Sequence, residues 1–100
     1  MKKRFVVALD SSTKEQDEKF KEYIKTNKYG WWHWIDGFWL LVDSSGQLTA
    51  KKLRSDLDEF YPRVRRVVLE LRDNDDTWSG FGPKKDGKSM FDWLHRNWTS

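Results

Sequence analysis

An Asp-Gly pair separates two apolar runs in residues 31–42, WWHWIDGFWLLV. Asp36-Gly37 suits the two-residue turn of a β-hairpin in which both central positions take positive φ. This turn predicts the pairing of the two strands, with Ile35 opposite Phe38. Because side chains alternate between the faces of a strand, the pairing predicts two apolar faces. One face holds Trp31, His33, Ile35, Phe38, Leu40 and Val42, and the other holds Trp32, Trp34, Trp39 and Leu41.

Periodic segments flank the hairpin on both sides. Residues 4–9 (RFVVAL) form a short apolar run that is typical of a buried strand. Residues 63–72 (RVRRVVLELR) alternate between two faces, which predicts a further strand. Apolar side chains recur at helical spacing in residues 13–27 and again in residues 49–60, which predicts two helices.

Each predicted helix begins with a capping signal. Ser12 and Glu15 fit a capping box, and Thr49 fits the N-cap of the second helix. The resulting order β-α-β-β-α-β predicts an α+β, ferredoxin-like fold: a four-stranded antiparallel sheet with two helices on one face. We expect one domain over residues 1–100, in which residues 72–100 form a loop and a short helix that pack on the domain or on a dimer partner.

Composition narrows the classes of function. The chain has no cysteine, which excludes disulfides and thiolate metal sites. The apolar run that follows MKKR ends at Asp10, too early for a signal peptide or a membrane span. We therefore expect a cytoplasmic protein with no membrane partner and no small-molecule cofactor.

The second face of the predicted hairpin needs another surface to shield it from solvent. If both helices pack on the first face, Trp32, Trp34 and Trp39 are open to solvent, and each indole can bury roughly 200 Å². Together they exceed the apolar patch that a monomer normally exposes. Three covers remain open: a second copy of the chain, the C-terminal segment with its own tryptophans (Trp78, Trp93 and Trp98), or stacked nucleic-acid bases.

Asp10 is the candidate for a metal site. It closes the first predicted strand, where a carboxylate could hold Mg²⁺ or Mn²⁺, especially if a dimer axis brought two copies together. The alternative is a helix-entry aspartate beside Ser11 and Ser12. His33 could act as a general base only with an orienting acid, and no partner is evident in the sequence, which favours a core or edge histidine.

Three arginines are the candidates for phosphate binding. Arg63, Arg65 and Arg66 precede and enter the last strand, in a segment with a local excess of positive charge. They could hold the phosphates of a nucleic acid. The alternative is a charged strand edge that discourages aggregation.

The chain resembles the SinR-like proteins, small relatives of the second CRISPR-associated adaptation protein and of VapD-type ribonucleases. The resemblance rests on VVALD ending at Asp10, on the block at 31–42, on LTAKKLRSDL at 48–57 and on RRVVLEL at 65–71, with Gly80-Phe81 and Asp92-Trp93-Leu94 as further matches. It implies a ferredoxin-like fold that commonly pairs through its sheet into a homodimer.

Two functions follow from the residues and the resemblance together. The first is a non-catalytic homodimeric scaffold, associated with nucleic acid in a mobile-element or defence context, whose partner surface is Trp32, Trp34, Trp39 and Leu41. The second is a metal-dependent nuclease, because in the CRISPR-associated relatives the aspartate at the position of Asp10 binds a metal between subunits. The sequence shows no second catalytic residue, which favours the scaffold.

Overall fold

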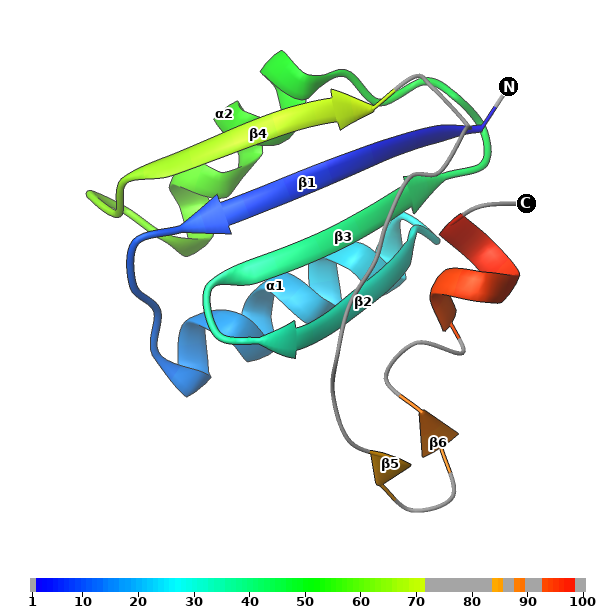
Figure 1. The fold of residues 1–100 in the computed structure, drawn as a ribbon. Helices are drawn as coiled ribbons and strands as arrows, with labels where there is room; N and C mark the ends of the chain where they lie inside the picture. Colours follow the sequence, from blue (N-terminus) through cyan, green and yellow to red (C-terminus); the bar gives the residue numbers. More distant parts are fainter. Residues whose placement is uncertain (1, 72–83, 86–87, 90–92, 99–100) are drawn as a thin grey trace.

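The computed structural model describes residues 2–71, 84–85, 88–89 and 93–98. Its main elements follow the predicted order: β1 (Lys3–Leu9), α1 (Lys14–Thr26), β2 (Gly30–Ile35), β3 (Phe38–Asp43), α2 (Ala50–Phe60) and β4 (Arg66–Leu71) (Figure 1). Two short strands, β5 (Lys84–Lys85) and β6 (Lys88–Ser89), and the five-residue π-helix η1 (Leu94–Trp98) come after them.

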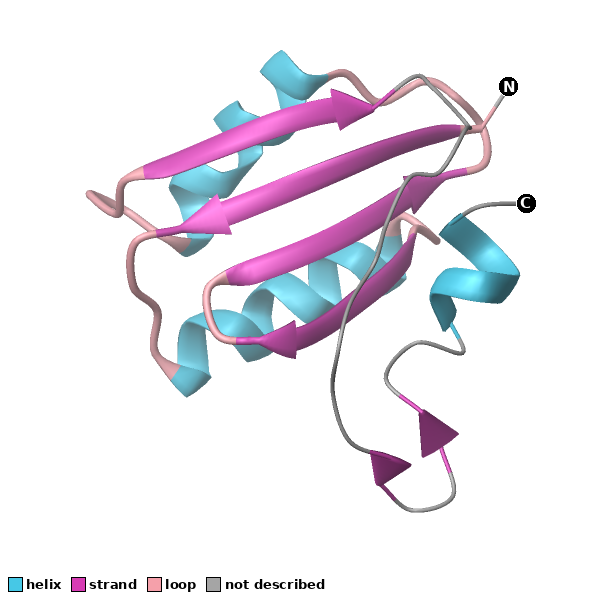
Figure 2. Ribbon diagram, viewed as in Figure 1, coloured by secondary structure: helices cyan, strands magenta, loops and turns pink. Residues whose placement is uncertain are grey.

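The first four strands form one antiparallel sheet in the order β2-β3-β1-β4. Both α-helices lie on the same face of this sheet, α1 behind β2 and β3 and α2 behind β4 (Figure 2). The predicted α+β fold of the ferredoxin-like type is therefore confirmed. Within the described residues, no helix is long and apolar enough to cross a membrane.

The helix starts agree with the sequence to within one residue. Thr13, not Ser12, is the N-cap of α1, and its capping box is completed by the side chain of Gln16 rather than that of Glu15. Thr49 caps α2 as predicted, and its hydroxyl accepts from the backbone N–H of Lys52 at 3.1 Å.

A hydrophobic core fills the space between the sheet and the two helices. Its centre is Trp39 on β3, whose ring packs edge-on against Phe20 of α1 with centroids 4.8 Å apart. The buried members of this cluster are Phe5, Val7, Leu9, Phe20, Ile24, Trp39, Leu41, Leu48, Leu53, Leu57 and Tyr61. Trp39 and Leu41 therefore lie on the helix side of the sheet. The prediction that these two side chains face away from the helices is wrong.

An irregularity in the hairpin explains this error. Ile35 pairs with Phe38 as predicted, but the register shifts by one residue between Trp32 and Ile35, so that Trp31 faces Leu41 rather than Val42. The extra residue in β2 is a β-bulge, which reverses the faces of one strand relative to its partner. The expected turn geometry is also corrected, because Gly37 has φ 72° while Asp36 is not among the residues with positive φ.

The other face of the sheet is apolar as well, and η1 covers part of it. Leu94 and Trp98 of η1 are buried against Trp32, Leu40 and Val42. The guanidinium of Arg4, on β1, lies 5.4 Å from the centroid of the Trp98 ring and donates to the Trp98 carbonyl at 3.2 Å. The C-terminal segment is thus the cover of Trp32, while Trp78 lies outside the described residues.

Candidate functional site

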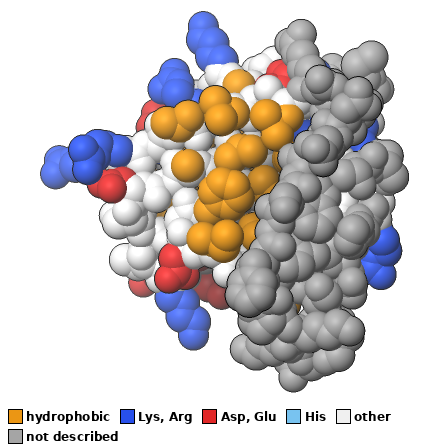
Figure 3. Space-filling model, viewed as in Figure 1, with side chains coloured by type: hydrophobic (Ala, Val, Ile, Leu, Met, Phe, Trp, Pro, Cys, Tyr) orange, Lys and Arg blue, Asp and Glu red, His pale blue; other side chains and the backbone are white. Residues whose placement is uncertain are grey.

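Beside the part of this face that η1 covers lies an apolar surface, which we call the open patch. Strand pairing places its residues side by side: Val6 faces Leu69, and Ala8 faces both Val67 and Phe38. Figure 3 looks onto this face and shows apolar side chains gathered over the strands. Val67 and Leu69 are 56% and 51% exposed. The open patch consists of Val6, Ala8, Ile35, Phe38, Val67 and Leu69.

The predicted partner surface is only partly accessible. Trp39 and Leu41 are buried under the helices, and Trp32 is buried under η1. Trp34 is the one predicted member that stays exposed, at 42%. The exposed apolar surface is therefore the open patch on β1, β2, β3 and β4, and of the predicted partner surface it is joined only by Trp34.

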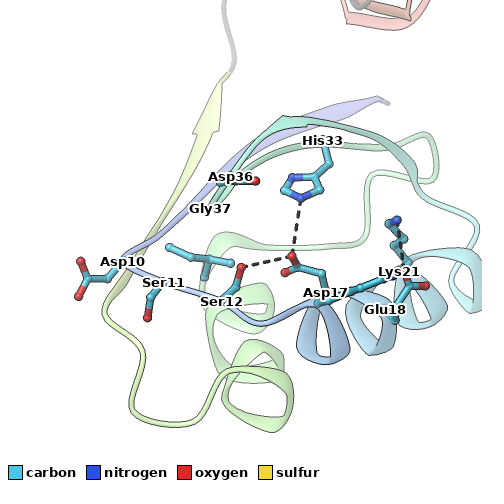
Figure 4. Close-up of a pocket in the computed structure, with 11 residues that line it drawn as sticks. Asp10, Ser11, Ser12, Asp17, Glu18, Lys21, His33, Asp36 and Gly37 are labelled. Carbon is cyan, nitrogen blue, oxygen red and sulfur yellow. Dashed lines mark hydrogen bonds and ion pairs between the residues drawn. The ribbon is translucent and has the colours of Figure 1, made fainter. Parts of the chain in front are cut away.

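Asp10 lies at the end of β1 as predicted, but its side chain is engaged with an arginine. Its Oδ2 accepts from Nε and Nη2 of Arg65 at 3.1 and 3.0 Å. Figure 4 shows the carboxylate of Asp10 pointing away from His33 and Asp17. A guanidinium on the carboxylate competes with a metal ion. Among the residues that the structure describes, no group of three or more His, Cys, Asp or Glu side chains could hold one.

The three candidate arginines do not converge on one site. Arg66 is turned under the end of α2, where Nη2 donates to the Tyr61 carbonyl at 2.7 Å and Nη1 binds the carboxylate of Asp58. Arg65 holds Asp10, and Arg63 is exposed with φ 66°. Two of the three thus have structural partners inside the chain.

A polar groove of about 590 Å³ lies beside the start of α1 and the end of the hairpin. The sequence does not reveal its main contact, in which Asp17 of α1 reaches His33 of β2 (Figure 4). Nε2 of His33 lies 3.9 Å from Oδ2 of Asp17. Asp17 also accepts hydrogen bonds from the Tyr61 hydroxyl at 2.7 Å and from the Ser12 hydroxyl at 3.2 Å.

The surroundings of His33 fix the orientation of its ring. Nδ1 lies 3.0 Å from the Phe38 carbonyl, which can only accept, so Nδ1 carries a proton. The imidazole stacks on Trp39 with centroids 3.7 Å apart and an angle of 2° between the rings. Ser12 donates to Asp17 rather than to His33, so the imidazole does not activate the Ser12 hydroxyl. The cluster joins α1, β2 and the end of α2, which is a structural role.

One signal in the sequence could have pointed to Asp17. Asp17, Phe20 and Ile24 are spaced by three and four residues and so share one helical stripe. Phe20 and Ile24 are buried core residues, so the same stripe turns Asp17 toward the sheet.

Several ionisable groups of the fold have perturbed proton affinities. Burial and the hydrogen bond to Asp17 raise the pKa of the Tyr61 hydroxyl, and burial and the hydrogen bond to Asp56 raise the pKa of Tyr23. Burial alone would raise the pKa of Asp43, but hydrogen bonds from Leu48 and Ser45 outweigh it and hold this pKa below its ordinary value. None of these groups lines the open patch, and all three stabilise loops or helix contacts.

The chain was compared with known proteins at three levels. No protein-family model, no curated protein and no solved structure matches it. The resemblance to the SinR-like proteins therefore stays a prediction from the sequence motifs.

Proposed function

We propose that this chain is a non-catalytic interaction module of the SinR-like type that forms a homodimer. The observation that carries the proposal is the open patch, whose outer residues Val67 and Leu69 are each more than half exposed on a regular strand. A contiguous exposed apolar patch on a small domain is a common mark of an interaction site.

The chemistry of the open patch favours a protein partner over nucleic acid. Sheets that bind single-stranded nucleic acid combine aromatic side chains with lysine or arginine on the same face. The open patch contains Phe38 as its sole aromatic ring and no charged side chain. Such a surface gains free energy mainly by excluding water against another apolar surface.

The two polar clusters support a non-catalytic role. Asp10 is held by Arg65, and Asp17 is held by Tyr61 and Ser12, so each carboxylate already has hydrogen-bond donors within the chain. The nuclease alternative needs Asp10 as a metal ligand. We expect neither the wild type nor Asp10→Ala to cleave RNA or duplex DNA with Mg²⁺ or Mn²⁺. Cleavage by the wild type that Asp10→Ala abolishes would instead establish the nuclease.

Light scattering coupled to size exclusion tests the role of the open patch. We expect the wild type to elute as a dimer and Leu69→Ser to shift toward monomer, because the substitution removes an exposed apolar contact without opening the core. Lys25→Ser, at an exposed position of α1, is the matched control and should leave the dimer unchanged. A dimer equally stable in all three proteins would show that the open patch is not the interface.

A further inference from the structure

We propose that His33 and Asp17 form a binding site for one Zn²⁺ ion, with Nε2 of His33 and Oδ2 of Asp17 as its two protein ligands. The site lies in the polar groove between the start of α1 and the hairpin (Figure 4). It includes neither Asp10 nor the open patch, so it stands independently of the proposed homodimer. A bound ion would tie α1 to β2.

The imidazole of His33 presents one defined nitrogen to the groove. Its Nδ1 donates to the Phe38 carbonyl at 3.0 Å, so Nε2 is the nitrogen left for a ligand. Histidines that bind metals commonly have this arrangement, in which a backbone carbonyl holds the other ring nitrogen. The stacking of the ring on Trp39, with centroids 3.7 Å apart, fixes the direction in which Nε2 points.

The carboxylate of Asp17 is oriented by two hydroxyls and keeps capacity for a further ligand. The Tyr61 hydroxyl donates to Oδ1 at 2.7 Å, and the Ser12 hydroxyl donates to Oδ2 at 3.2 Å. An ionised carboxylate offers about four acceptor positions, so these two bonds leave part of its capacity unused. Carboxylates that bind metals are themselves held by hydrogen bonds of this kind.

The distance between the two ligand atoms suits a bridging ion. Nε2 of His33 lies 3.9 Å from Oδ2 of Asp17, which is too far for a direct hydrogen bond of about 2.7–3.2 Å. A Zn²⁺ ion bound about 2.0–2.1 Å from each atom would hold them roughly 3.4 Å apart at the tetrahedral angle. The two side chains therefore need to approach each other by only about 0.5 Å.

The charge of the groove favours a cation, and the ligand types favour zinc. The charged side chains that line it with His33 are Asp10, Asp17, Glu18 and Asp36 against Lys14 and Lys21. This excess of carboxylates attracts cations. An imidazole ligand suits Zn²⁺ better than Mg²⁺ or Ca²⁺, which prefer oxygen.

The number of ligands sets the strength of binding. The described residues supply no third His, Cys, Asp or Glu ligand beside this pair, so water would complete the coordination. We therefore expect Zn²⁺ to bind more weakly than in structural zinc sites with four protein ligands, and to exchange with solvent through the open groove.

Nitrogen-15 NMR of the histidine rings tests the site in the wild-type chain. The chain has two histidines, His33 and His95, and His95→Gln assigns their signals. We expect Zn²⁺, added as the chloride near pH 7, to shift the Nε2 signal of His33 while its Nδ1 stays protonated. An Nε2 signal that Zn²⁺ leaves unchanged overturns the proposal. So does an equal response of both histidines, which would indicate unspecific binding.

Titration calorimetry with Zn²⁺ identifies the ligands. We expect Tyr61→Phe, which removes a hydrogen bond that orients Asp17, to raise the dissociation constant roughly tenfold. Asp17→Asn and His33→Gln should raise it by more than that, and Zn²⁺ should raise the melting temperature of the wild type but not that of His33→Gln.

Asp10→Ala is the matched control for the calorimetry. The Asp10 carboxylate lines the same groove but points away from His33 and Asp17 (Figure 4). This variant should therefore bind Zn²⁺ as the wild type does. Binding that persists unchanged in Asp17→Asn, or that Asp10→Ala abolishes, would place the ion elsewhere and overturn the proposal.

Discussion

Replacing Tyr61 by phenylalanine tests the buried contact that joins the two helices. The hydroxyl of Tyr61 donates to Asp17 at 2.7 Å, and the Tyr61 side chain is fully buried. A hydrogen bond to a charged group contributes about 1.5–3 kcal/mol to the free energy of unfolding. The Asp17 side chain is 20% exposed and keeps the donor Ser12, so the lower value of about 1.5 kcal/mol applies. The melting temperature should fall by about 6–12 °C.

The pH dependence of stability gives this variant a second signature. Burial and the bond to Asp17 raise the pKa of Tyr61, so the hydroxyl stays protonated in the fold where it ionises in the unfolded chain. The stabilisation is present below the ordinary tyrosine pKa of about 10 and is lost as the pH rises above it, by about 1.4 kcal/mol for each pH unit. Tyr61→Phe should remove the part of the alkaline loss of stability that Tyr61 causes. Tyr23, whose pKa is also raised, should still cause its own part.

Urea unfolding at one fixed protein concentration measures both effects. The free energy of unfolding of the wild type and Tyr61→Phe is compared at pH 7 and between pH 10 and 11. In an Asp17→Asn background the cost of Tyr61→Phe should shrink, because the charged acceptor is gone. A loss at pH 7 below about 0.5 kcal/mol, together with an unchanged alkaline slope, would refute the role given to this contact.

Three further perturbations have definite expected outcomes. Asp43→Asn should lower the free energy of unfolding at pH 7 by about 1–3 kcal/mol. Because the pKa of Asp43 is lowered in the fold, its carboxylate stabilises the fold at pH values above the ordinary aspartate pKa, and this stabilisation is lost as the pH falls; the variant should therefore lose less stability in acid than the wild type does. An equal loss in acid would contradict this. Trp98→Ala should uncover Trp32, cost up to about 3–5 kcal/mol and shift tryptophan emission to longer wavelength; unchanged emission argues against the η1 contact. Arg65→Ala should cost under about 1 kcal/mol, since its pair with Asp10 is exposed; a larger thermal shift would contradict that.

The order of the elements could be predicted from the sequence because each has its own periodicity. Thr49 caps α2 and Asp36-Gly37 forms the turn of the hairpin, as the sequence predicts, because both features depend on residues close together in the chain. Residues that act within one turn of a helix or one hairpin loop are the ones that local patterns describe best.

The faces of β3 could not be predicted, for a physical reason. A one-residue slip is normally penalised because it moves apolar side chains into water. In this hairpin both faces are apolar, so Trp39 and Leu40 can each be buried on either side of the sheet. The alternating pattern therefore contains no information about the bulge, and it places Trp39 and Leu41 on the exposed face although both are buried.

The stripe shared with Phe20 and Ile24 turns Asp17 toward the sheet, but the sequence does not show that it meets His33, because that depends on where α1 lies along β2. Moving the N-cap from Ser12 to Thr13 changes the residues that begin the first turn. The sequence does not decide which surface covers Trp32 for a related reason, since an apolar segment such as η1 can pack on its own sheet or on a second copy. Sequence patterns show that a surface must be covered, and the structure shows which segment covers it.

Sedimentation velocity on the wild-type chain over a range of micromolar concentrations tests the central claim most directly. A single copy has a mass of 12.1 kDa. We expect the weight-average mass to rise from this value toward that of a dimer as concentration increases, and the rise to be abolished by Val67→Lys with Leu69→Lys. A mass that stays at 12.1 kDa throughout the range would contradict the proposal that the open patch joins two copies of this chain.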